Sequence, residues 1–155
     1  MTVRLGRLRT VHPALVLAAL DLVGLFIASY LSIVELRGDL PVCGPLHGCE
    51  EVARSSYSRI NGVPVAVFGV ALSLVLLTLA IAWWRTDDGR LLAAHYGLSL
   101  VGVMFEGWFT SIELFVIGAV CVWCAAYGIS LLARFLVALA VWRRRERNPD
   151  PVRRT

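Results

Sequence analysis

The chain has 155 residues, a length that suits one domain. Hydrophobic residues make up 58% of it and the mean hydropathy is +0.73, well above the apolar share of about 45–50% in soluble proteins. A water-soluble domain of this size could hardly bury so much apolar surface, so the composition indicates an integral membrane protein. The net charge of +4 does not indicate nucleic-acid binding, because the arginines lie at segment ends rather than along one face.

Four apolar segments are long enough to cross a bilayer, which takes about 20 residues. The first is too long for the apolar core of a signal peptide and is followed by no fitting cleavage site, so we expect it to be retained. The last apolar stretch is about twice as long as one span needs and must turn once, most simply at Gly118. The sequence therefore predicts an all-α, four-helix transmembrane bundle, with spans at 13–36, 63–84, 91–116 and 119–142.

These spans belong to one membrane domain over residues 1–147, and the polar tail 148–155 is expected to be disordered. Eleven arginines fall on the side of both termini, against three in the loop between the first two spans. The positive-inside rule then predicts cytoplasmic termini in the inner (plasma) membrane. That loop and the start of the last span should face the oxidising, extracytoplasmic side.

All four cysteines form two close pairs on this outward side. Cys121 and Cys124 lie three residues apart at the expected start of a helix, so their sulfurs share one helical face. The helix N-terminus favours a thiolate there. Cys43 and Cys49 lie in the outward loop, where the glycines and proline between them predict an irregular, mobile segment. A mobile pair next to a fixed pair is the layout of an electron relay.

Other interpretations of the cysteines stay open at this point. The Cys-x-x-Cys pair can be two small apolar residues without a function, and the loop pair can be one structural disulfide. A four-cysteine zinc site is disfavoured, because such sites usually lie in soluble knuckles. Haem attachment is excluded, since Ala125 rather than histidine follows Cys124. We therefore expect no metal.

Three acidic residues lie inside the spans, where ionisable groups are costly and often functional. We expect Glu106 to relay protons, to pair with Arg134, or to bond a neighbouring helix in its protonated form. Glu113 should reach water at the outward end, and Asp21 should be structural.

Three further expectations concern the outward surface. Residues 55–61 should form a short interfacial helix that caps the bundle. His47 should be a solvated loop residue, and Trp123 should anchor the last span at the membrane interface rather than stack on a bound ring.

From about residue 21 to 130, the sequence resembles the vitamin K epoxide reductase family in its bacterial, disulfide-forming branch. Residues 49–57 are similar to the family's C-x-x-V-x-x-S-x-Y, and residues 62–69 to its G-[IV]-P-x-x-x-F-G. The first span matches less well, with Ala28 at a serine position. The disulfide bond protein B family also has two pairs, but it carries Cys-x-x-Cys in its first outward loop, so the order here favours the former family.

The resemblance implies a role for each site residue. Cys43 would take electrons from a separate, DsbA-like thioredoxin-fold protein, and Cys49 would pass them to Cys121. Cys124 would then reduce a membrane quinone, menaquinone or ubiquinone, bound in the bundle. Ser55 matches the family's loop serine and would lie near the quinone. The expected partners are thus this thiol protein, the quinone and the lipid bilayer, without nucleic acid.

Two departures bear on the substrate. Val65 and Gly128 stand where vertebrate members carry the asparagine and tyrosine that hold vitamin K ketones, and Tyr127 is one position off. We therefore expect a thiol:quinone oxidoreductase that supports disulfide bond formation. The alternative is a vitamin K quinone or epoxide reductase that uses thiols as reductant. The non-enzyme alternative is a small membrane protein held by one loop disulfide.

Overall fold

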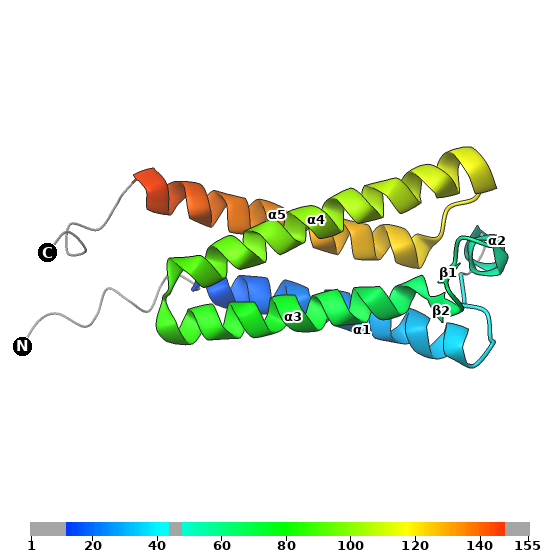
Figure 1. Cartoon of the computed structure of the whole chain (residues 1–155), viewed down its shortest axis with the longest axis horizontal. Helices are drawn as coiled ribbons and strands as arrows, with labels where there is room; N and C mark the ends of the chain where they lie inside the picture. Colours follow the sequence, from blue (N-terminus) through cyan, green and yellow to red (C-terminus); the bar gives the residue numbers. More distant parts are fainter. Residues whose placement is uncertain (1–11, 44–47, 148–155) are drawn as a thin grey trace, which may run out of the picture.

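The computed structural model describes residues 12–43 and 48–147. Four long helices form an elongated bundle (Figure 1), and all four are long and apolar enough to cross a membrane. The predicted all-α bundle is confirmed, and the chain is a multi-pass membrane protein. The elements are α1 (Pro13–Leu36), α2 (Gly48–Arg54), β1 (Arg59–Ile60), β2 (Val63–Pro64), α3 (Val65–Thr86), α4 (Gly89–Ile112), the π-helical turn η1 (Glu113–Ile117) and α5 (Val122–Arg147).

Hydropathy located every span, and local capping sets the observed limits. The first span begins and ends where expected, whereas the other limits shift by a few residues. Asp87 adopts a left-handed backbone at the end of α3, and the Asp88 carboxylate accepts a hydrogen bond from the backbone N–H of Arg90, so α4 starts at Gly89. Gly118 has φ +72° and ends η1, which confirms the predicted turn.

The short helix between the first two spans lies earlier in the sequence than predicted. The expectation of a helix over 55–61 is wrong, because α2 ends at Arg54 and a small antiparallel hairpin follows. Asn61 and Gly62 both have positive φ, 50° and 83°, the backbone of the tight two-residue turn that Asn-Gly favours. Cys49 lies in α2, and thus in a helix rather than in an irregular loop. His47 and residues 148–155 lie outside the described residues.

A buried polar network joins all four spanning helices, because the Arg134 guanidinium also donates a hydrogen bond of 3.3 Å to the Ser73 hydroxyl of α3. Asp21 of α1 lies 3.4 Å from Arg134 of α5 and 3.1 Å from His95 of α4, and all three side chains are buried. Of the three roles considered for Glu106, pairing with Arg134 is therefore wrong, because Arg134 pairs with Asp21. A Cβ atom at Gly24 would collide with the Arg134 guanidinium, so this glycine makes room for the buried cation. Pairing and hydrogen bonding are what make buried charges tolerable in a bundle.

An apolar plug closes the bundle at the end where α1 starts and α5 finishes. It packs side chains from all four spanning helices into one buried cluster. Its members are Ala14, Leu17, Ala80, Trp83, Leu92 and Ala138. Figure 1 shows α2, β1 and β2 at the opposite end of the bundle. The elements between α1 and α3 and the apolar plug thus lie at opposite ends of the bundle.

Candidate redox site

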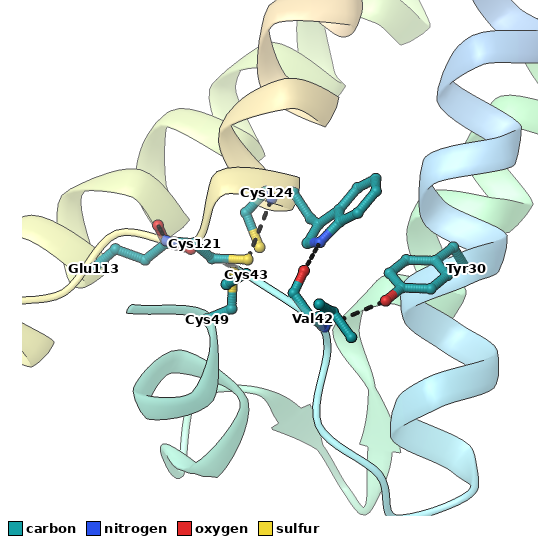
Figure 2. Close-up of a disulfide and its surroundings, with 8 residues drawn as sticks. Tyr30, Val42, Cys43, Cys49, Glu113, Cys121 and Cys124 are labelled. Atoms are coloured by element: carbon teal, nitrogen blue, oxygen red, sulfur yellow. Dashed lines mark hydrogen bonds between the residues drawn. A yellow bond between two sulfur atoms is a disulfide. The ribbon is translucent and has the colours of Figure 1, made fainter. Parts of the chain in front are cut away.

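Both cysteine pairs lie at the end of the bundle opposite the apolar plug. Cys43 and Cys49 form a disulfide with their Cα atoms 6.0 Å apart, while Cys121 and Cys124 are free thiols. Figure 2 shows the four cysteines gathered in one place, with the Cys121 sulfur between the disulfide and Cys124. The structure thus brings together all four cysteines that the sequence singled out.

Close backbone packing places the disulfide beside the start of α5. Gly48 begins α2, and a Cβ atom there would collide with the carbonyl oxygen of Val120 and lie 2.9 Å from its backbone nitrogen. Only a glycine fits without displacing one of the two segments. Each of these residues directly precedes a cysteine, Cys49 and Cys121, whose exposed fractions are 0% and 2%. The contact therefore holds two buried sulfurs near each other.

A second contact holds the residue before Cys43. The Trp123 indole nitrogen donates a hydrogen bond of 2.9 Å to the carbonyl oxygen of Val42, and the N–H of Val42 donates one of 3.3 Å to the Tyr30 hydroxyl. The Tyr30 and Trp123 rings lie 4.7 Å apart between centroids. Trp123, which we expected to be an interface anchor, therefore fastens the Cys43 segment to α1 and α5.

The local backbone activates Cys121. The residue immediately precedes α5, and its sulfur accepts a hydrogen bond of 3.4 Å from the backbone N–H of Cys124, as an N-cap side chain would. The side-chain hydrogen bond with Cys124 lowers the pKa of the Cys121 thiol, and backbone N–H groups act in the same direction, against burial and the charge of Glu113. A thiolate is the form that attacks or leaves in disulfide exchange.

Glu113 lies against this pair. Its carboxylate accepts a hydrogen bond of 3.1 Å from the backbone N–H of Cys121, and the residue is only 4% exposed. The prediction that Glu113 reaches water is therefore wrong. The η1 turn and the bend at Gly118 bring the chain back so that a residue at the end of one span contacts the start of the next.

A mostly apolar cavity of about 450 Å³ opens next to Cys124. The polar side chains of its wall are those of Glu35, Ser55, Tyr57, Ser58, Glu106, Glu113, Cys124 and Tyr127. Apolar residues from the helices around it form the rest of the wall, among them Leu31, Val52, Phe68, Phe105, Phe109 and Leu131. A concave, apolar site with few polar groups is the usual form of a small-molecule site.

Tyr127 is the site residue that sequence reasoning passed over. Its hydroxyl donates a hydrogen bond of 3.1 Å to the carbonyl oxygen of Gly69 and lies 3.4 Å from the Ser73 hydroxyl, and its ring lines the cavity. In the sequence, Tyr127 lies one position before Gly128, which stands where vertebrate family members carry their tyrosine. Helix geometry supplies the missing signal, because residues three and four positions after Cys124 share nearly the same face.

Comparison with known proteins decides the family. The model of the vitamin K epoxide reductase family matches residues 15–139, most of the chain. This protein belongs to the vitamin K epoxide reductase family. No individual curated protein matches the chain. As a family member, the protein is an oxidoreductase, and the family suggests a membrane enzyme of thiol–disulfide chemistry.

The family uses quinones, and the cavity suits one. A quinone ring is flat and apolar with two carbonyl oxygens. The wall offers aromatic side chains, the Cys124 thiol and the hydroxyls of Ser55, Tyr57, Ser58 and Tyr127. Within residues 12–43 and 48–147, no group of three or more histidine, cysteine or acidic side chains is arranged to hold a metal ion.

Proposed function

We propose that this protein is a membrane thiol:quinone oxidoreductase that reoxidises an extracytoplasmic, DsbA-like thioredoxin-fold carrier and so supports protein disulfide formation. One observation carries the proposal. Cys124 belongs to the cavity wall, whereas Cys121, its neighbour in the pair, lies beside the Cys43–Cys49 disulfide. The inner pair thus stands between an outer disulfide and a site for an apolar acceptor.

Exposure supports the order of thiol exchange. Cys43 is partly exposed whereas Cys49 is fully buried, so a partner thiolate would attack Cys43 and release Cys49. The second thiol of the partner then attacks its own mixed disulfide with Cys43, which leaves the partner oxidised and releases Cys43. The freed Cys49 sulfur attacks Cys121 of the oxidised inner pair and releases Cys124. Cys43 then attacks Cys49, which re-forms the outer disulfide and releases Cys121. Each exchange breaks one S–S bond and forms another, with two electrons transferred in total.

The cavity residues support the final step. A bound quinone, menaquinone or ubiquinone, supplies an acceptor of two electrons and two protons. Cys124 belongs to the cavity wall, together with aromatic side chains that suit a flat quinone ring. The Ser55 hydroxyl donates to the carbonyl oxygen of Val52 at 2.7 Å, so its lone pairs can accept a hydrogen bond from an O–H of the quinol product, and Tyr127 adds another hydroxyl to the wall.

Charge supports the orientation. Arg143, Arg144, Arg145 and Arg147 lie in the last turns of α5, at the end of the bundle opposite the cysteines. Together with the other arginines near the termini, they favour cytoplasmic termini in the inner membrane. The cysteine pairs would then face the extracytoplasmic side, where oxidised carrier proteins work.

The test is quinone reduction by the full-length protein in detergent, with a reduced thioredoxin-fold donor and single Cys→Ala variants at all four positions. All four variants should lose turnover with the protein donor. Cys43→Ala and Cys49→Ala should recover with a small permeant dithiol, because it reaches Cys121 and Cys124 directly. Quinone reduction that persists without Cys121 and Cys124 would refute the relay. Fast turnover with a vitamin K epoxide as sole acceptor would favour the alternative reductase.

A further inference from the structure

Three carboxyl groups line the cavity beside Cys124, those of Glu35, Glu106 and Glu113, and two of them come from one continuous stretch of chain. Glu106 comes from α4, and Glu113 begins η1 two helical turns later. Glu113 is tied to the inner cysteine pair through the N–H of Cys121. Glu106 also lines the cavity, and none of the ion pairs among the described residues includes its carboxyl group.

A glycine on the facing helix makes room for Glu106. A Cβ atom at Gly128 of α5 would lie 3.0 Å from Cγ and 3.2 Å from Oε1 of Glu106. Both distances are tighter than ordinary van der Waals contact, so a larger residue there would push the Glu106 side chain aside. Gly128 is the position where the sequence led us to expect a missing polar group. The polar group at this point of the wall comes from α4 instead.

The proposed reaction needs proton carriers in an apolar space. Oxidation of two thiols to a disulfide releases two protons, and reduction of a quinone to a quinol takes up two, so the sum is neutral. Protons pass between such groups only through titratable side chains or water. The titratable groups of the described wall are Glu35 of α1, Tyr57 of the loop after α2, Glu106, Glu113, and Cys124 and Tyr127 of α5.

Position selects two of these groups. Tyr57 is 47% exposed at the rim, and Glu35 sits at the outward end of α1. Tyr127 already donates its proton to the carbonyl oxygen of Gly69. Glu113 lies against the cysteines, and Glu106 lies along the same helix farther into the bundle.

We propose that Glu113 receives the thiol protons as a carboxylate and that Glu106 protonates the quinone oxygens as a carboxylic acid. This inference rests on the proposed function. In each of two rounds, one S–H bond breaks toward Glu113, one O–H bond forms from Glu106, and the proton on Glu113 restores Glu106. Two electrons pass from the sulfurs to the quinone, one S–S bond forms, and each carboxyl ends as it began.

The test measures single turnover of the pre-reduced protein with menadione in Glu106→Gln, Glu113→Gln and Glu106→Asp. Glu51→Gln on the exposed face of α2 is the matched control. We expect both glutamine variants to lower the rate by about 10²-fold, the usual contribution of a general acid or base. The KM for menadione and the exchange of the Cys43–Cys49 disulfide with a small dithiol should stay unchanged. Glu106→Asp, which keeps a carboxyl, should retain part of the rate.

The pH profile adds a readout that a merely structural role would not move. An acid must hold its proton, so the wild-type rate should fall as pH rises, and Glu106→Gln should lose this fall. Gly128→Ala should slow the step by displacing Glu106 while leaving its carboxyl in place. Wild-type rates in both glutamine variants, or a raised KM with an unchanged rate constant, would overturn the proposal. No menadione reduction by the wild type would instead refute the proposed function itself.

Discussion

Trp123 ties the segment before Cys43 to the helix that carries Cys124, because its indole nitrogen donates a hydrogen bond of 2.9 Å to the carbonyl oxygen of Val42. The two cysteine pairs are far apart in the sequence, and this bond is one of the few direct links between them. We therefore expect electron transfer between the pairs to depend on Trp123, although this residue is itself neither oxidised nor reduced.

Trp123→Phe removes this hydrogen bond and keeps an aromatic ring against Tyr30. A typical hydrogen bond contributes about 1 kcal/mol, which corresponds to about fivefold in rate. We expect turnover with a thioredoxin-fold donor to slow by about that factor, while turnover with a small dithiol that bypasses Cys43 stays normal. Equal slowing with both donors would show that Trp123 acts on the inner pair or the cavity instead.

Gly48→Ala should separate the two pairs. The new methyl group would collide with the carbonyl oxygen of Val120 and force α2 away from the start of α5. A shift of about 1 Å between reacting groups can cost about 10²-fold in rate, so we expect a large loss of transfer from Cys49 to Cys121. Rapid-quench thiol trapping measures this step directly. Gly97→Ala is the control, because a Cβ atom there meets nothing within 4 Å.

Cys121 should react at lower pH than an ordinary thiol. Its pKa is lowered, first by the hydrogen bond with Cys124, from a usual value of about 8.5. In a Cys43→Ser/Cys49→Ser background, alkylation of Cys121 by iodoacetamide should rise with pH and level off below the pH at which glutathione does. Cys124→Ala should move that midpoint upward. Mass spectrometry of the α5 peptide reads out the site, and an unmoved midpoint would contradict the assigned cause.

Arg134→Met should destabilise the bundle strongly. The substitution leaves the Asp21 carboxylate buried without its cation, and breaking a buried pair from one side costs about 3–5 kcal/mol. Asp21→Asn combined with Arg134→Met removes both charges and should recover much of the loss. The midpoint of thermal unfolding in detergent reports both effects. If the double variant is less stable than the single one, the charge pair is not what stabilises this part of the core.

Hydropathy and motif spacing predicted the architecture and the four cysteines, because both signals are local in the sequence. Apolar runs of span length predict helices whatever those helices pack against. Gly118 predicts the turn because the backbone at the end of η1 is left-handed, a conformation that glycine adopts readily. The loop motif likewise led to Ser55, which the structure places in the cavity wall.

Side-chain partners were harder to predict, because they depend on how each helix is rotated and which helices touch. The sequence suggested Glu106 as a possible partner of Arg134, whereas the packing of α1 against α5 brings Asp21 to it instead. The position of Glu113 near the end of a span predicted exposure to water. It is buried because the chain bends after η1 and brings Cys121 against its carboxylate. Residues 55–61 form no helix because Asn61-Gly62 makes the tight turn of a hairpin, which pairs β1 with β2.

The apolar plug has a consequence for the energetics of the cell. The plug lies at the end of the bundle where α1 starts. Both cysteine pairs, Glu106 and Glu113 lie beyond it, toward the opposite end. Under the proposed mechanism, electrons and protons move together and neither crosses the plug. Carrying one elementary charge across a membrane involves about 2.3 kcal/mol per 100 mV, and here that transfer does not occur. Turnover would then neither generate nor consume membrane voltage, so disulfide formation would continue in a depolarised cell.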